Sequence, residues 1–295
     1  MTTIKAFINS HPLLSFFALV FAIAWGGILI LVGGPSGIPT NEEQFERLMP
    51  WVMLALLAGP SVAGIVLTGL VYGREGFRNL LTRMRRWRVG ARWYALALLT
   101  APLLYVGVSL ALLLTSSEFV PGILATSDKA SLLLMGIAYG LLGGGLLEEL
   151  GWTGFATPTL LRQHYSVLAT GLIIGVLWGV FHWPVNGWAG VTFSGALSVA
   201  ISLPLQLFFT VAGLTAFRVL MVWVYERTGE SLLVAMLMHA SLTASMIILP
   251  PVVTGVAFLT YNLVFTAALW VVVGAVVLVN GGHLTRQLPL RKRVA

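Results

Sequence analysis

The sequence contains no cysteine and very little charge. Of its 295 residues, 9% are charged and 58% are hydrophobic, whereas a soluble domain usually carries about 25% charged residues. The absence of cysteine excludes disulfides, thiolate metal sites and a cysteine nucleophile. A chain with so few polar side chains could not cover its surface in water, so we expect lipid to be its solvent.

Charged residues are missing from long stretches of the chain. None occurs between Arg92 and Glu118, and the stretches 162–218 and 230–286 are each long enough for two crossings. A helical crossing needs about 20 apolar residues, and helices satisfy their own backbone groups in lipid. We predict an all-α, polytopic membrane helix bundle of about eight transmembrane helices, with residues 1–295 forming a single transmembrane domain. The expected spans are 12–32, 51–72, 93–114, 131–150, 167–183, 195–225, 232–249 and 258–279.

Basic residues flank the predicted spans. The net charge is +7, and seven arginines lie between positions 74 and 92. The positive-inside rule makes this segment a cytoplasmic loop that contacts anionic lipid headgroups, and nucleic-acid binding is not expected. Both termini are predicted to be cytoplasmic, in a bacterial cytoplasmic membrane. The inside then receives Lys5, the arginine-rich loop, Arg162, Arg227, and the tail with Arg286, Arg291, Lys292 and Arg293. The outside receives Glu42, Glu43, Glu46, Glu118 and Asp128, with Arg47 and Lys129 as minor exceptions.

Few ionisable residues fall inside the predicted spans. Glu148 and Glu149 stand in the fourth, His182 in the fifth and His239 in the seventh, while Arg218 lies near a predicted inner boundary. An ionisable residue within a membrane is costly and indicates a functional site by default. The structural alternatives are a solvated pair at a helix end for the glutamates and an interhelical hydrogen bond for each histidine.

Glycines share the predicted helix face of Glu148. Gly140, Gly144 and Gly151 recur at helical spacing with it, and small residues let helix backbones approach closely. We therefore expect Glu148 to face protein and not lipid.

The depth of Glu148 in the membrane depends on where its helix ends. If the fourth helix stopped at Leu150, Glu148 would lie at the rim, too far from His182 to meet it. The two side chains can meet if that helix continues, tilted or kinked near Pro158, to about Arg162. We predict the longer helix.

One carboxylate and two imidazoles are groups that peptide hydrolysis can use. Glu148 could take a proton from water, and His182 and His239 could hold that water and donate to the oxyanion. Thr243, one turn after His239, would add another donor. Two histidines and one glutamate are also the ligands of some hydrolytic zinc sites, so Glu148, His182 and His239 are candidate ligands of a divalent metal such as zinc. The His-Glu-x-x-His motif is absent, and the spacing leaves metal dependence open.

At these residues the sequence resembles the CPBP family of intramembrane proteases, the type II CAAX prenyl endopeptidase and bacteriocin-immunity-like group. The family pattern is Glu-Glu with Arg four residues later, then Phe/Trp-x-x-x-His, then His-x-x-x-Asn. Glu148 and Glu149 match the pair, Trp178 and His182 match the second element, and His239 matches the third.

The resemblance implies a fold and a mechanism. It implies an eight-helix, CAAX-protease-like core over about residues 50–250, with Glu148 as the general base. Glu149, His182 and His239 would complete the catalytic site, and Trp178 and Thr243 would contribute to oxyanion or substrate binding. The motif does not settle whether the family needs a metal.

The sequence departs from the family pattern at two positions. Thr153 replaces the Arg that would form an ion pair with Glu149, and Thr243 replaces the Asn. Threonine cannot neutralise a carboxylate, so Glu149 is expected to be either protonated or paired with a more distant base.

The first functional hypothesis is an intramembrane endopeptidase. Its substrate would be a membrane protein or a lipidated peptide within the bilayer, with prenylated CAAX-type proteins as the family's example. The second hypothesis is a non-catalytic membrane scaffold or bacteriocin-immunity-like protein, which Thr153 and Thr243 favour. A proton-coupled transporter ranks last, because it predicts duplicated halves and the sequence shows no repeat.

Overall fold

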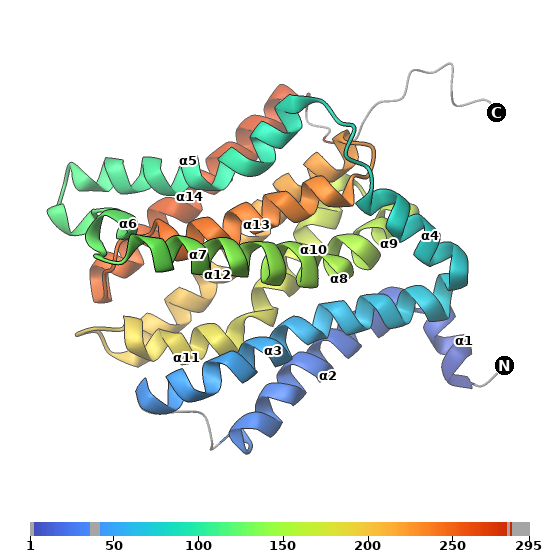
Figure 1. Ribbon diagram of the computed structural model, residues 1–295, viewed down its shortest axis with the longest axis horizontal. Helices are drawn as coiled ribbons and strands as arrows, with labels where there is room; N and C mark the ends of the chain where they lie inside the picture. Colours follow the sequence, from blue (N-terminus) through green and yellow to red (C-terminus); the bar gives the residue numbers. More distant parts are fainter. Residues whose placement is uncertain (1–2, 36–41, 282–283, 285–295) are drawn as a thin grey trace.

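A computed structural model describes residues 3–35, 42–281 and 284, and over these residues all regular elements are helices (Figure 1). Within this described part of the chain, six helices are long and apolar enough to cross a membrane, and two further apolar helices, Val167–Phe181 and Leu232–Ile248, are shorter. The predicted polytopic helix bundle is therefore confirmed. The six long helices are Pro12–Val32, Glu46–Met84, Ala91–Leu113, Lys129–Arg162, Val199–Arg227 and Gly255–Val279.

The helical elements are labelled in chain order, and some of the long helices comprise several consecutive elements. Their order is α1 (Thr3–Ser10), α2 (Pro12–Val32), α3 (Glu42–Leu67), η2 (Thr68–Tyr72), α4 (Gly73–Met84), α5 (Ala91–Leu113), η3 (Ser117–Phe119), α6 (Gly122–Ala125), α7 (Lys129–Tyr139), η4 (Gly140–Glu148), α8 (Glu149–Gly151), η5 (Trp152–Ala156), α9 (Thr157–Arg162), α10 (Val167–Phe181), α11 (Trp183–Phe193), α12 (Val199–Arg227), α13 (Leu232–Ile248) and α14 (Gly255–Val279).

Different helices lie at the two ends of the bundle. The arginine-rich helix α4 lies with α1 and α9 at one end, and α6 and α11 lie at the other (Figure 1). This grouping agrees with the predicted alternation of spans. The basic tail from Arg286 lies outside the described residues, and the cytoplasmic orientation of the termini and the bacterial membrane stay predictions.

Two serine hydroxyls and one aspartate carboxylate act as N-terminal caps of three helices. Ser166 accepts a hydrogen bond from the backbone N–H of Ala169 at the start of α10, and Ser231 does the same for Val234 at the start of α13. Asp128 caps α7 in this way. Each cap satisfies a backbone N–H group that has no partner within its own helix.

The fourth long helix is continuous but irregular. It runs from Lys129 to Arg162, which confirms the predicted longer helix, and it is π-helical over η4 and η5. π turns use i→i+5 hydrogen bonds and so rotate the side chains that follow. Gly144 consequently packs against α13 and Gly151 against α3, so the prediction that these glycines share one face with Glu148 is wrong.

Neighbouring side chains satisfy the backbone carbonyls of this irregular helix. Ser61 of α3 donates to the carbonyl oxygen of Leu147 at 2.7 Å, and Thr157 donates to that of Trp152. Arg83 of α4 donates to the carbonyl oxygen of Gly154 at 2.7 Å. An unsatisfied backbone group in lipid costs several kcal/mol. Arg83 is one of the arginines that predicted a cytoplasmic loop. Because it is buried and binds backbone carbonyls, it also stabilises the fold.

Three glycines let α10 approach α12 closely. A Cβ added to Gly175 would lie 2.6 Å from the Cα of Thr215, so no side chain fits between the two backbones there. Two equally close contacts join Gly171 to Val219 and Gly179 to Val211. This small-residue packing places Trp178 on α10 beside Arg218 on α12.

We expect Gly175→Ala to lower the thermal stability of the protein in detergent. The added methyl group would have to displace the backbone at Thr215, and such overpacking typically costs about 1–3 kcal/mol. The matched control is Gly107→Ala in α5, where a Cβ would meet nothing within 4 Å. Equal shifts of the unfolding midpoint for the two variants would contradict the close packing of α10 on α12.

Candidate active site

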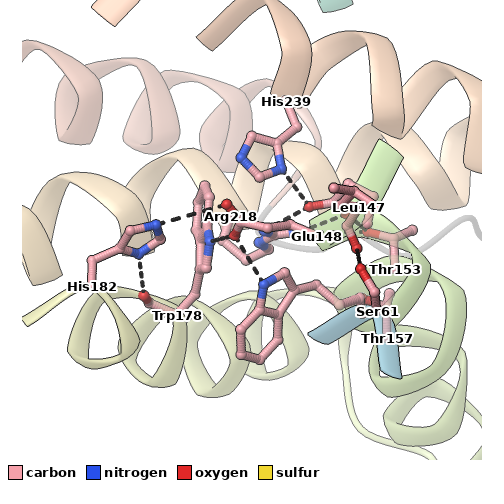
Figure 2. Close-up of polar contacts among 11 residues, drawn as sticks. Ser61, Leu147, Glu148, Thr153, Thr157, Trp178, His182, Arg218 and His239 are labelled. Atoms are coloured by element: carbon pink, nitrogen blue, oxygen red, sulfur yellow. Dashed lines mark hydrogen bonds and ion pairs between the residues drawn. The ribbon is translucent and has the colours of Figure 1, made fainter. Parts of the chain in front are cut away.

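Three parts of the chain bring the predicted site residues together. Glu148 ends η4 and Glu149 begins α8, His182 directly follows α10, and His239 lies on α13 (Figure 2). Both glutamates and His239 are buried, whereas the side chain of His182 is 20% exposed. The site is therefore closed except beside His182.

Two indole rings hold one oxygen of Glu148. Its Oε2 accepts hydrogen bonds from Trp178 Nε1 at 2.7 Å and from Trp152 Nε1 at 3.2 Å. Its Oε1 lies 3.8 Å from His182 Nε2, which is too far for a direct hydrogen bond and suits a shared water. Glu148 thus has one fixed oxygen and one that faces the accessible histidine.

The orientation of His182 follows from its backbone contact. Its Nδ1 lies 2.8 Å from the carbonyl oxygen of Trp178. A carbonyl only accepts hydrogen bonds, so Nδ1 carries the hydrogen and Nε2 of the neutral ring is an acceptor. His182 can therefore donate towards Glu148 or an oxyanion only as the imidazolium.

Glu149 is enclosed by donors. Arg218 Nη2 lies 2.9 Å from Glu149 Oε1, and Arg218 Nη1 donates to Oε2 at 3.0 Å. His239 Nδ1 lies 2.7 Å from Oε1, and the hydroxyl of Thr153 donates to Oε2. Both oxygens are therefore engaged. Because Thr153 stands where the family has Arg, Glu149 was expected to be either protonated or paired with a more distant base. Arg218 is that base.

Trp178 connects the two glutamates. Its ring lies under the Arg218 guanidinium, 4.0 Å from ring centroid to Cζ, and against the His239 ring at 4.8 Å between centroids. Its N–H donates to Glu148. In this structure the indole N–H donates to the Glu148 carboxylate, and the predicted role of Trp178 in oxyanion or substrate binding stays a prediction.

His239 and Thr243 share the face of α13 that lies against Gly144. A Cβ added at Gly144 would lie 2.8 Å from His239 Nε2 and would also meet the hydroxyl of Thr243. Their predicted common face is confirmed. A side chain at Gly144 would displace the His239 ring, so the glycine run positions the site.

The proposed metal ligands do not fit a metal ion. Among the residues that the structure describes, no group of three or more His, Asp and Glu side chains is arranged to hold one. His239 is directed at Glu149, and Glu149 already has the Arg218 guanidinium as its cation. Only Glu148 and His182 remain, which are too few donors for a protein zinc site.

Arg218 is the residue that sequence reasoning missed. It is fully buried although it was assigned to a span boundary. Two signals pointed to it: it follows a long charge-free stretch from Arg162, and Thr153 left Glu149 without the expected partner. An arginine in a membrane span needs an acidic or carbonyl partner, and Glu149 was the acid that lacked one.

A comparison with protein families identifies this region. Residues 129–245 match the family model described as type II CAAX prenyl endopeptidase Rce1-like, and this segment contains both glutamates and both histidines of the site. No curated protein matches the chain. The chain is thus an integral membrane protein whose segment 129–245 is similar to the type II CAAX prenyl endopeptidase, Rce1-like family, which confirms the predicted resemblance.

We expect Arg218→Leu to lower the free energy of unfolding by about 3–5 kcal/mol, because it leaves a buried carboxylate without its cation. Glu149→Gln should also destabilise the protein, and the double variant should lose clearly less than the sum of the two. Unfolding in detergent of the wild type and the three variants measures this coupling.

The exposed pair of Arg78 and Glu75, 3.3 Å apart, is the matched control for the cycle. Exposed pairs contribute about 0–1 kcal/mol, so Arg78→Gln should change stability little. Additive losses for Arg218 and Glu149 would show that the buried pair contributes no coupling.

Proposed function

We propose that the protein is an intramembrane endopeptidase in which Glu148 activates water. The observation that carries this proposal is the asymmetry of the Glu148 carboxylate. Two indoles fix Oε2, while Oε1 faces the accessible His182 Nε2 at 3.8 Å. A water between these two atoms would be held by a base and an imidazole at the exposed edge of the site.

The proposed reaction is hydrolysis of a peptide bond by this water. Glu148 Oε1 takes a proton as the water oxygen bonds to the substrate's carbonyl carbon. The C–N bond then breaks, and Glu148 returns the proton to the leaving nitrogen. His182, as the imidazolium, would stabilise the oxyanion formed in between.

The second acid has a different role in this proposal. The contacts of Glu149 with Arg218 and Thr153 leave it no oxygen for water. It instead orients His239 through the 2.7 Å contact to Nδ1. Thr243 would then present a donor to the substrate beside Gly144, and His239 Nε2 could donate there only as the imidazolium. We propose that these residues lie in one transmembrane domain that spans residues 1–295.

The proposed substrate is a membrane-associated protein, with a prenylated CAAX-type protein as the family's example. An apolar cavity of about 290 Å³ between α5, α7 and α13 supports an apolar attachment, because Leu98, Ile137 and Leu141 line it. Of its two polar lining residues, Ser241 and Ser245, Ser241 donates to the carbonyl oxygen of Leu98. A prenylated peptide should accordingly be cleaved faster than the unmodified peptide.

We expect Glu148→Gln to lower the rate of peptide cleavage at least about 10²-fold, within the usual range of 10²–10⁴-fold for general-base catalysis. The amide can still accept hydrogen bonds from Trp152 and Trp178 but cannot take a proton, so the fold should survive. Cleavage of a fluorogenic prenylated peptide by purified protein, together with the unfolding midpoint, measures both effects.

Glu118→Gln makes the same chemical change at an exposed position and is the matched control. A folded Glu148→Gln variant that cleaves as fast as the wild type would contradict the proposal. If the wild-type protein cleaves no peptide and Glu148→Gln leaves the protein's role in the cell intact, the non-catalytic scaffold replaces the endopeptidase as the proposed function.

Removing divalent metals should leave cleavage unchanged, because the site residues do not form a metal-binding group. The measurement is the cleavage rate after dialysis against a strong chelator, compared with the rate after adding zinc back. Loss of activity on chelation and its recovery with zinc would contradict the metal-free mechanism.

A further inference from the structure

A second cavity lies where η2, α4, η5 and α9 meet. It measures about 200 Å³, and its polar lining residues are Thr68, Tyr72, Glu75, Asn79, Arg83 and Arg162. These elements belong to the same end of the bundle (Figure 1). The cavity therefore joins two arginines at the ends of two membrane spans.

Arg83 supplies a positive charge to the lining of this cavity. Its side chain is only 5% exposed. Nη2 donates to the carbonyl oxygen of Gly154, and Nη1 donates to Tyr225 at 2.8 Å and to the carbonyl oxygen of Thr153. Its Nε has no hydrogen-bond partner among the described residues. The guanidinium thus binds only neutral acceptors in these contacts, so its charge would attract an anion in the cavity.

Arg162 supplies the second positive charge. It is exposed, and its guanidinium carbon lies 4.6 Å from the centroid of the Tyr72 ring. Its hydrogen bond to Thr159 is long, at 3.5 Å. The Tyr72 ring thus holds the guanidinium at the cavity while leaving it able to take a stronger acceptor.

We propose that this cavity binds a phosphate group, and that the phosphate belongs to a membrane phospholipid headgroup. Two guanidinium groups at one small cavity match the geometry and charge of phosphate. Small-molecule pockets usually start at about 300 Å³, so the cavity suits one phosphate better than a peptide. Its position at the ends of the spans is where headgroups lie. The proposal does not depend on endopeptidase activity.

Glu75 lowers the affinity of this cavity for an anion in our proposal. Its carboxylate lines the cavity but is exposed and lies 3.3 Å from Arg78. Because it repels an anion, Glu75→Gln should strengthen phosphate binding. A site for a cationic or neutral ligand would respond in the opposite way or not at all.

Binding should also stabilise the catalytic helix. Arg83 holds the carbonyls of Thr153 and Gly154, and the hydroxyl of Thr153 donates to Glu149. A ligand that fixes Arg83 binds only the folded protein and therefore raises the unfolding midpoint. This gives the proposal a readout that needs no substrate.

The test uses the full chain, delipidated in neutral detergent, with three probes. Dioleoyl phosphatidylglycerol should be retained in native mass spectrometry and raise the unfolding midpoint. Dioleoylglycerol, which has the same chains without phosphate, should do neither. Inorganic phosphate at millimolar concentration should not displace the phospholipid. Equal effects of the two lipids would overturn the proposal, and displacement by inorganic phosphate would overturn the lipid as the source.

Arg162→Gln should weaken phosphatidylglycerol binding about tenfold, the effect of losing one charge-assisted hydrogen bond. Arg85→Gln removes the same charge from an exposed residue outside the cavity lining and should leave binding nearly unchanged. Glu75→Gln should raise affinity. If Arg162→Gln and Arg85→Gln weaken binding equally, the lipid is held by surface charge in general and the cavity site is overturned.

Discussion

The buried ion pair between Glu149 and Arg218 is the constraint on which the site depends. A carboxylate and a guanidinium with no exposed side-chain surface are tolerated in a membrane only together, because either one alone would be an uncompensated charge. The pair joins α8 to α12, and its two further contacts fix Thr153 and His239. Since these contacts engage both oxygens of Glu149, Glu148 is the acid to which we assign the proposed chemistry.

Two adjacent glutamates serve different purposes because their helix is irregular. Glu148 points towards Trp178 of α10 (Figure 2), whereas Glu149 contacts Arg218 of α12 and His239 of α13. The π turns on either side of them free backbone carbonyls, and donors from neighbouring helices, among them Ser61 and Arg83, satisfy these groups. The irregularity is therefore stabilised from outside the helix. Such π segments are frequent at functional sites.

Much of this arrangement was predictable from composition and spacing. Charge-free runs predicted the spans, and the cost of burying ionisable groups in lipid singled out Glu148 as facing protein. The need for Glu148 to reach His182 predicted the long fourth helix, which the structure confirms. Arg83 and Arg218 were missed because both stand at the edges of apolar runs, where an arginine usually marks topology. Their burial depends on which helix lies alongside.

The sequence by itself determined that the chain forms a membrane helix bundle, because the solvent preference of each segment is a local property of its side chains. It also determined which residues are too costly to face lipid. Only the tertiary structure decided that Arg218 neutralises Glu149, that His239 turns to Glu149, and that Glu148 directs one oxygen towards His182. These pairings join residues up to 90 positions apart, and their partners are set by how helices pack, which no local pattern specifies.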